Sequence, residues 1–271
     1  MGNLTVALTF DVDCQSYLEG RAAAMADELD RAFEVLGPLF ERHPSWRASW
    51  FLRIDPGMHA FDRQAGLLRD RVKRGDRLGW HFHGPLKRVS EFARHARAEG
   101  LDLSRIGFGR ASNRVMRALA AAGFGIDSTA MPRPIYKWTR RGVDWTTTPD
   151  EPYHPSMADY RVPGEPALPI LEVPISCGEV LAPDDNQKVV RYLNPAYHQG
   201  IFEAALSQWV RRHAHLVTIT HPYEVLRGPK HGLLAFDPHA FEENVVAVER
   251  VAAFRTLSGL AGEGALEVAS A

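Results

Sequence analysis

Two acids follow the first apolar run of the chain at a spacing that suits chemistry. Asp11 and Asp13 come directly after residues 4–10, with one residue between them. Because alternate residues of a strand point to the same face, these carboxylates would share one face at the strand's end. Ligand sites of parallel α/β proteins form at that end of the strands. The pair is therefore a candidate for metal or acid–base chemistry, with a solvated turn as the alternative.

Two further segments end in histidines. His81 and His83 close the run 78–83, directly before a Gly-Pro break. Neutral imidazoles combined with a carboxylate suit a zinc-type ion that has three protein ligands and an open position for water. His221 ends the run 216–220. It could serve as a general acid because histidine titrates near neutral pH, although taken alone it is more simply a structural histidine.

The elements that must position these residues alternate along the chain. Apolar runs predict strands at 4–10, 48–54, 78–83, 106–109, 125–128, 170–175 and 216–220. Helical periodicity predicts helices at 21–42, 60–74, 87–99, 112–122, 200–212 and 238–257. This alternation favours parallel strands with crossover helices, in a doubly wound sheet or a (β/α) barrel. On a barrel the three chemical segments would meet on one face.

Composition excludes several classes of protein. The 271 residues include 45% hydrophobic and 24% charged residues, which is typical of a globular chain. The net charge of −1 gives no field that would attract nucleic acid or an anionic membrane. Cys14 and Cys177 are too few for a disulfide framework. No signal-peptide pattern and no run of about 18 apolar residues occurs. We expect a cytoplasmic protein without a transmembrane segment and without a nucleic-acid partner.

The chemical segments resemble, in order, the motifs of the polysaccharide deacetylases (carbohydrate esterase family 4, the NodB homology domain). Residues 9–13 (Thr-Phe-Asp-Val-Asp) resemble the first motif, in its variant with one residue between the acids. Residues 79–81 (Gly-Trp-His) resemble the start of the second motif, and residues 107–110 (Gly-Phe-Gly-Arg) the third. Residues 171–176 are similar to a later strand, and residues 221–224 (His-Pro-Tyr-Glu) to the fifth motif.

The resemblance implies a fold, a reaction and a role for each residue. The fold would be a deformed, TIM-like (β/α) barrel over residues 1–258, followed by a flexible tail at 259–271. The catalytic residues would be Asp11 as the base, Arg110 as the residue that orients it, and His221 as the acid. The metal ligands would be Asp13, His81 and His83, holding a divalent ion, Zn²⁺ foremost, with Co²⁺ or Ni²⁺ as possible substitutes.

The implied reaction is hydrolysis of an N-acetyl or other acyl group on an amino sugar. Combined with the expected cytoplasmic location, this suggests a nucleotide-linked or lipid-linked sugar as substrate, as in surface-polysaccharide (O-antigen-like) assembly. The sequence indicates neither the particular sugar nor the oligomeric state.

The chain departs from the family pattern at several positions. The second motif usually has its second histidine four residues after the first, where this chain has Pro85, so His83 is the nearest substitute. The third motif usually has proline after its arginine, where this chain has Ala111. The acid that supports the catalytic histidine is not evident, and Asp144 and Glu172 are both candidates. These departures leave open a catalytically silent carbohydrate-binding barrel.

Two rival enzymes share part of the pattern. An Asp-x-Asp segment after a first strand also matches a magnesium-dependent phosphatase of the haloacid dehalogenase type, which would give the three histidines no role. A metal-dependent amidohydrolase could use the His-x-His pair, although such enzymes usually carry it on the first strand.

Other residues are secondary candidates. Arg53 and Asp55 follow the second strand and could contact substrate. His213 and His215 form a second His-x-His, which we interpret as a solvated turn. The irregular, aromatic stretch 131–169 would be an ordered loop over a site. Its aromatic residues could stack on a sugar or form a small loop core: Tyr136, Trp138, Trp145, Tyr153 and Tyr160.

Overall fold

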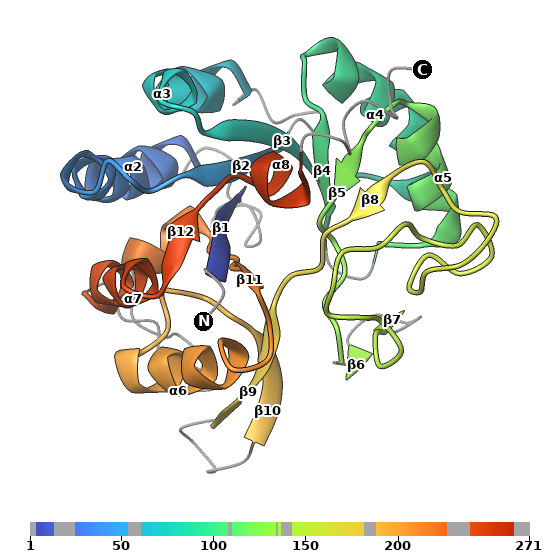
Figure 1. Cartoon of the computed structure of the whole chain (residues 1–271). Helices are drawn as coiled ribbons and strands as arrows, with labels where there is room; N and C mark the ends of the chain where they lie inside the picture. Colours follow the sequence, from blue (N-terminus) through green and yellow to red (C-terminus); the bar gives the residue numbers. More distant parts are fainter. Residues whose placement is uncertain are drawn as a thin grey trace.

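The computed structural model describes residues 4–13, 25–53, 61–107, 110–133, 135–136, 143–181, 188–226 and 239–262. Its centre is a curved sheet of parallel strands (Figure 1). The order is β11 (His215–Val217), β1 (Leu4–Val12), β2 (Ala48–Arg53), β3 (Arg77–Phe82), β4 (Leu103–Ile106), β5 (Ile126–Asp127) and β8 (Leu171–Glu172). A further strand, β12 (Ala252–Phe254), pairs in parallel with the first residues of β1.

The sheet curls until its two edges nearly meet, and Ser176 links them. The backbone N–H of Ser176 donates to the carbonyl of Val217 at 2.9 Å, and its Oγ accepts from the N–H of Val217 at 2.9 Å. Ser176 lies just after β8, whereas Val217 ends β11. Ser176 therefore connects the segment after β8 to β11 and closes the ring. The predicted deformed (β/α) barrel is confirmed.

The inward face of the ring changes from apolar to polar along β1 to β5. The lower layer is a buried apolar cluster of Ala7, Phe51, Leu103, Ile126, Val173, Val217 and Leu257. Two residues further along β1 to β5 lies the upper layer, which consists of Thr9, Arg53, His81, Arg105 and Ser128. Because side chains alternate with a period of two, residues two positions apart point to the same face. The inward face is therefore a hydrophobic core in the lower layer and a candidate site in the upper layer. The upper layer lies toward the carboxyl ends of the strands.

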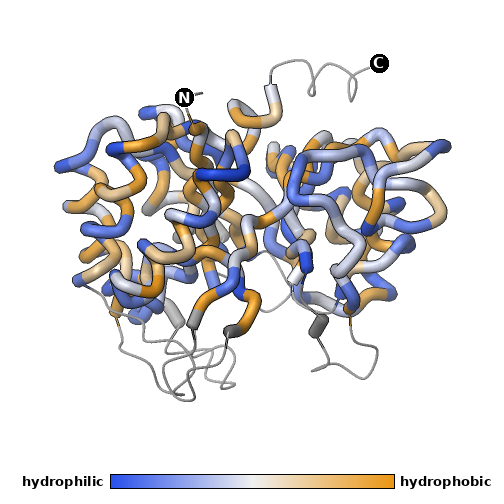
Figure 2. Tube along the Cα trace, turned by 60° about the horizontal axis from the view of Figure 1, so that its bottom comes forward, coloured by the Kyte–Doolittle hydropathy of each residue, from blue (hydrophilic) through white to orange (hydrophobic). Residues whose placement is uncertain are grey.

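Helices cover the outside of the ring (Figure 1). They are α2 (Met25–Arg42), α3 (Phe61–Lys73), α4 (Val89–Ala98), α5 (Asn113–Ala121), α6 (Gln199–Trp209) and α7 (Ala240–Glu249). One large core joins α2, α6 and α7 to β1 and β2, where the rings of Phe10 and Trp50 stack at 4.1 Å. A second core joins α4 and α5 to β3 and β4 around Trp80 and Phe82. In Figure 2 the strands inside carry long hydrophobic stretches, and many outer turns are hydrophilic.

The connection between β5 and β8 contains no helix among its described residues. It includes a small hairpin of β6 (Ile135–Tyr136) and β7 (Val143–Asp144) and then pairs with β8 through Tyr153 and Glu172. Trp145 and Tyr153 are buried, and the ring of Trp145 meets that of Tyr160 edge-on at 5.5 Å. These aromatic residues thus form a small core, as one of the two sequence hypotheses proposed. Trp138 lies outside the described residues.

The remaining short elements lie near the carboxyl ends of the strands or after them. A second hairpin consists of β9 (Cys177–Leu181) and β10 (Lys188–Tyr192). Two 3₁₀ turns follow strands, η2 (Leu86–Arg88) after β3 and η3 (Pro222–Leu226) after β11. Within the described ranges, no helix is both long enough and apolar enough to cross a membrane.

Three sequence expectations need correction. The strand expected at 106–109 is β4 at 103–106, because polar residues of this strand face the barrel interior. The helix expected at 238–257 ends at Glu249, and β12 then pairs with β1 beside residues 4–6. The flexible tail expected at 259–271 overlaps ordered structure, because α8 (Leu257–Ala261) is a helix that packs on the lower layer. Residues 263–271 lie outside the described residues.

The lower layer leaves no room for a side chain on β3. A Cβ on Gly79 would lie 2.8 Å from Cδ1 of Phe51 and 3.0 Å from Cβ of Leu103. We expect Gly79→Ala to lower the free energy of unfolding by about 1–3 kcal/mol, as overpacked cores do. The control is Gly66→Ala on α3, where no atom lies within 4 Å of the added Cβ and alanine favours the helix. Equal urea midpoints for the two variants would contradict the packing of the layer.

Candidate active site

Strands β1 and β3 bring together the three residues expected to bind metal. One ligand atom each from Asp13, His81 and His83 lies within 4.8 Å of the others. Nε2 of His83 is 2.9 Å from Nε2 of His81 and 3.9 Å from Oδ2 of Asp13. Asp13 and His81 are buried, whereas His83 is half-buried. The arrangement leaves one partly accessible side, which a substrate would need.

The surroundings of His81 keep it neutral and aimed at this cluster. Its Nδ1 lies 3.2 Å from the carbonyl oxygen of Arg105. Since a carbonyl only accepts, Nδ1 must carry the proton, and Nε2 then offers its lone pair. Burial, reinforced by the neighbouring His83, holds the pKa of His81 well below its ordinary value. A neutral imidazole with a fixed lone pair is the form that binds a metal.

Gly107, just after β4, makes the position of His83 possible. A Cβ on this residue would lie 2.2 Å from Nε2 of His83 and overlap the imidazole ring. The backbone N–H of Gly107 donates to the carbonyl of Phe82 at 2.8 Å, which holds the glycine beside the end of β3. The space next to Gly107 thus lets a histidine two residues after His81 reach the cluster.

Asp13 is held as an anion by a buried arginine. Nη1 of Arg53, which is fully buried, donates to Oδ1 of Asp13 at 3.0 Å. Burial opposes ionisation of Asp13, but Arg53 and the nearby imidazoles outweigh it and lower the pKa of the carboxyl. One carboxylate with two imidazoles is a donor set that fits a zinc-type cation. The structure places Arg53 against Asp13, and Asp55 lies outside the described residues.

The arginine that contacts Asp11 is not the expected one. Nη1 of Arg105, within β4, donates to Oδ1 of Asp11 at 2.9 Å. Nη1 of Arg110 instead donates to the carbonyl of Gly84 at 3.0 Å. The assignment of Arg110 as the residue that orients Asp11 is therefore corrected to Arg105. The family motif drew attention to the residues after β4, whereas the contact comes from inside the strand.

Arg105 is itself fixed on several sides. Its Nε donates to the carbonyl of Ser128 at 2.6 Å, and its Nη2 donates to Oγ of Ser128 at 2.8 Å. Nη1 also donates to Oγ1 of Thr9 at 2.6 Å, and the guanidinium carbon lies 4.3 Å above the ring of Phe51. Arg105 thus joins the lower and upper layers and holds the carboxylate of Asp11 in one orientation.

His221 is held by an acid one turn away. Its Nδ1 lies 3.1 Å from Oε1 of Glu224, and its backbone N–H donates to Oε2 of the same carboxylate at 2.8 Å. Nδ2 of Asn194 also donates to Oε2, at 2.7 Å. Burial alone would lower the pKa of His221, but Glu224, with Asp11 and Asp13, raises it to about 9. The imidazole is therefore protonated at neutral pH and can act as an acid.

The two acids considered as supports for His221 lie elsewhere. Asp144 is exposed and accepts from the backbone and hydroxyl of Thr146. Glu172 is buried on β8 and accepts from the N–H groups of Thr129 and Ala130. Neither acid contacts His221 among the described residues, and the acid that does is Glu224, inside the fifth-motif segment 221–224.

His221 lies beside Asp11 because β1 continues next to the segment that follows β11. The N–H of Asp11 donates to the carbonyl of Thr220 at 3.0 Å, and Phe10 forms a parallel bridge with Thr220. The rings of Tyr223 and His221 lie 5.3 Å apart. The ends of β1, β3 and the β11 segment thus share one region, as the sequence predicted for a barrel.

The second His-x-His segment does not belong to this region. Nδ1 of His213 and Nδ1 of His215 contact different oxygens of Glu151, at 3.3 and 3.2 Å. The ring of His213 stacks on Trp209 at 3.9 Å. Both imidazoles are largely buried, so this segment is a packed cluster of two histidines and Glu151 rather than the solvated turn we expected. Cys177 is buried and free, and Cys14 lies outside the described residues.

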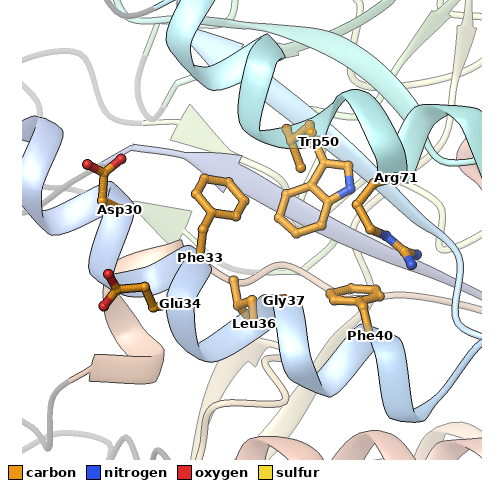
Figure 3. A pocket seen from close by; sticks show the side chains of 9 residues that line it. Asp30, Phe33, Glu34, Leu36, Gly37, Phe40, Trp50 and Arg71 are labelled. Atoms are coloured by element: carbon orange, nitrogen blue, oxygen red, sulfur yellow. The ribbon is translucent and has the colours of Figure 1, made fainter.

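A cavity of about 560 Å³ lies between α2 and α3, on the outside of the sheet (Figure 3). Phe33, Phe40 and Trp50 line it, and Asp30 and Glu34 stand at one side. The residues of the Asp11–His221 region do not line it. The cavity is therefore separate from the candidate active site.

Comparison with solved structures supports the fold. No family model and no curated protein matches the sequence. Among solved structures, the chain matches the crystal structure of a candidate polysaccharide deacetylase from Mycobacterium smegmatis, with a TM-score of 0.58 and 18% identity. The match covers 97% of this chain and 91% of that one. The class of fold is thus a deformed TIM-like barrel, and it is shared with that particular protein over almost the whole chain.

The position of Gly107 provides a test of His83 as a ligand. We expect Gly107→Ala to displace the imidazole and weaken binding of Zn²⁺ by at least about tenfold, the size of effect that supporting residues of metal sites show. His83→Ala should behave similarly. Gly200→Ala is the control, because its added Cβ makes only ordinary contacts with His198 at 3.8 Å. Elemental mass spectrometry after dialysis gives the metal content. Wild-type affinity in both site variants would place the third ligand elsewhere.

Proposed function

We propose that this protein is a metal-dependent deacetylase that hydrolyses the N-acyl group of an amino sugar. One observation carries the proposal: Asp11, bound by Arg105, and a protonated His221 lie beside the Asp13–His81–His83 cluster. A base, an acid and a cation site are the three components that amide hydrolysis needs. The shared barrel fold and the ordered motif resemblance add support.

The proposed reaction divides between these groups. A divalent cation held by Asp13, His81 and His83 would supply Lewis-acid polarisation of the amide carbonyl. Asp11 takes a proton from the attacking water, whose oxygen bonds to the carbonyl carbon. Arg105 keeps the carboxylate of Asp11 oriented toward that water. His221 gives its Nε2 proton to the amide nitrogen as the carbon–nitrogen bond breaks. Acetate and the free amino sugar leave.

The finer points of the proposal concern the metal and the substrate. Zn²⁺ is the foremost candidate because the donor set is one carboxylate and two imidazoles, and Co²⁺ or Ni²⁺ would substitute. The substrate would be a nucleotide-linked or lipid-linked acylated amino sugar in surface-polysaccharide assembly. This last step rests on the expected cytoplasmic location alone. Faster acetate release from finished polymer than from either precursor would contradict it.

Two alternatives make different predictions. A catalytically silent carbohydrate-binding barrel would bind metal and sugar but release no acetate from any acylated sugar. A phosphatase of the haloacid dehalogenase type would leave the cluster of His81 and His83 with Asp13 unexplained. We therefore keep the silent barrel as the second candidate, favoured by Pro85 at the usual ligand position.

Separate roles for the two acids of β1 are the central test. We expect Asp11→Asn to retain metal and to lower kcat for acetate release by about 10²–10⁴-fold, the usual contribution of a general base. Asp13→Ala should lose the metal together with the activity. Acetate release and metal content are measured on the same samples. An Asp11→Asn enzyme with an unchanged rate would rule out Asp11 as the base.

The pair of His221 and Glu224 predicts a pH dependence. The wild-type rate should fall as His221 loses its proton, at a pH no higher than about 9, because a bound cation can only lower that pKa. Glu224→Gln removes the negative charge that raises the pKa, so the alkaline limb should move to lower pH. Glu203→Gln on the exposed side of α6 is the control. A limb that stays in place in Glu224→Gln would remove His221 from the role of acid.

A further inference from the structure

Strands β5 and β8 carry a second pair of acids that the proposed reaction does not use. Asp127 and Glu172 are register partners across the β5–β8 ladder, and their exposed fractions are 0% and 2%. We infer that these two carboxyl groups share one proton and act as positioning residues for Arg105 and, through it, for Asp11. The inference rests on the proposed function, since that function makes Asp11 the base.

The hydrogen bonds around the pair leave one proton to be supplied. Oδ1 of Asp127 accepts from Oγ of Ser104 at 2.5 Å, and Oε1 of Glu172 accepts from the N–H groups of Thr129 and Ala130 at 2.9 and 2.8 Å. Oδ2 of Asp127 is buried and has no hydrogen-bond donor among the described residues. A proton between the two acids satisfies this oxygen without a further residue. Two bare carboxylates at this place would repel each other.

Electrostatics agree with this geometry. Burial raises the pKa of Glu172 well above its ordinary value, and the neighbouring Asp127 raises it further. Burial also raises the pKa of Asp127, against hydrogen bonds from its neighbours and the charge of Arg105. The other titratable groups facing the pair are Tyr153 and Tyr160, from the connection between β5 and β8. The pair therefore holds one proton and one negative charge at neutral pH.

The pair is tied to both sequence neighbours of Arg105. Asp127 accepts from Ser104, which precedes Arg105 on β4. Ile106, which follows Arg105, donates its N–H to Oγ1 of Thr129 at 2.8 Å. Thr129 is in turn held by Glu172 through its own N–H. The backbone of β4 on either side of Arg105 thus depends on the two acids.

The pair also fixes the residue that holds the Arg105 side chain. Glu172 binds the two N–H groups that directly follow Ser128. Ser128 accepts from Arg105 through both its carbonyl and its Oγ, at 2.6 and 2.8 Å. Without Glu172 the two buried N–H groups would lose their acceptor, which is costly for a buried donor. The loop that carries Ser128 would then move, and the guanidinium would no longer hold Asp11 at one angle.

Variants of Glu172 separate positioning from folding. We expect Glu172→Ala to lower kcat at least tenfold while KM changes less than twofold. Metal content should stay the same, because the ligands lie on β3 and directly after β1 and β3, away from Glu172. Glu172→Gln should restore kcat, since its amide oxygen accepts the two N–H groups and its NH₂ donates to Asp127. Asp144→Asn, on an exposed acid, is the control. Wild-type kcat in Glu172→Ala, or an equal loss in Glu172→Gln, would overturn the inference.

A readout without catalysis keeps this test independent of the proposed function. Solvent exchange of the Arg105 Nε–H, measured by ¹⁵N NMR, should be slow in the wild type and in Glu172→Gln. It should be at least tenfold faster in Glu172→Ala or, if that variant fails to fold, in Asp127→Ala, which removes the other acid of the pair. Unchanged exchange would overturn the inference. If the exchange behaves as expected but no acylated sugar releases acetate, the proposed function fails and the positioning stands.

The shared proton has its own signature in the pH dependence of stability. The folded pair keeps a proton that the unfolded chain loses above the ordinary carboxyl pKa, so this pair makes stability fall as pH rises. Asp127→Asn removes that contribution. The melting temperature of Asp127→Asn relative to the wild type should therefore be higher at pH 8 than at pH 5. If the melting temperatures of Asp127→Asn and the wild type differ by the same amount at pH 5 and pH 8, the shared proton is ruled out.

Discussion

The ion pair between Arg105 and Asp11 is the constraint on which the centre of the barrel depends. Both side chains are buried, and a buried charge that loses its partner destabilises a protein by about 3–5 kcal/mol. Arg105 therefore needs acceptors on every side, and it finds them in Thr9, Asp11 and Ser128. Thr9 and Asp11 lie on β1 and Ser128 directly follows β5, while Arg105 itself is on β4, so the pair forms across the inside of the ring. The contacts of Arg105 thus need the closed barrel, and the buried charge inside the barrel needs these contacts.

The closed ring in turn depends on the change of polarity along its strands. Below Arg105 the ring of Phe51 faces Leu103 and the empty position of Gly79, and α8 closes the end of the layer. Above it, the inward residues Thr9, Arg53, His81, Arg105 and Ser128 can hydrogen-bond or carry charge. The apolar layer supplies hydrophobic stabilisation, which offsets the cost of desolvating the charged layer. The border between the two layers is the ring of Phe51 against the guanidinium of Arg105.

The sequence was sufficient for those features that follow from periodicity and order. Asp11 with Asp13, and His81 with His83, could be paired because a spacing of two fixes a common face. Arg105 was not predicted because a serine followed by an arginine, as at residues 104–105, does not resemble a buried strand. Its signal is the spacing of two between Leu103 and Arg105 on one face of β4, continued by Gly107 just after the strand. The contact of Glu224 with His221 could not be predicted, since it depends on the turn of η3.

Two identical side chains on one strand thus acquire different chemistry from their neighbours. Asp13 faces Arg53, whose charge lowers the pKa of the carboxyl and keeps it an anionic donor beside His81 and His83. Asp11 faces Arg105 and the region of a protonated His221. Each of the two acids contacts a different buried arginine, Asp13 contacting Arg53 and Asp11 contacting Arg105. Both arginines lie in the upper layer, Arg53 on β2 and Arg105 on β4. The different chemistry of the two acids is therefore determined by β2 and β4, which carry the arginines, and not by β1.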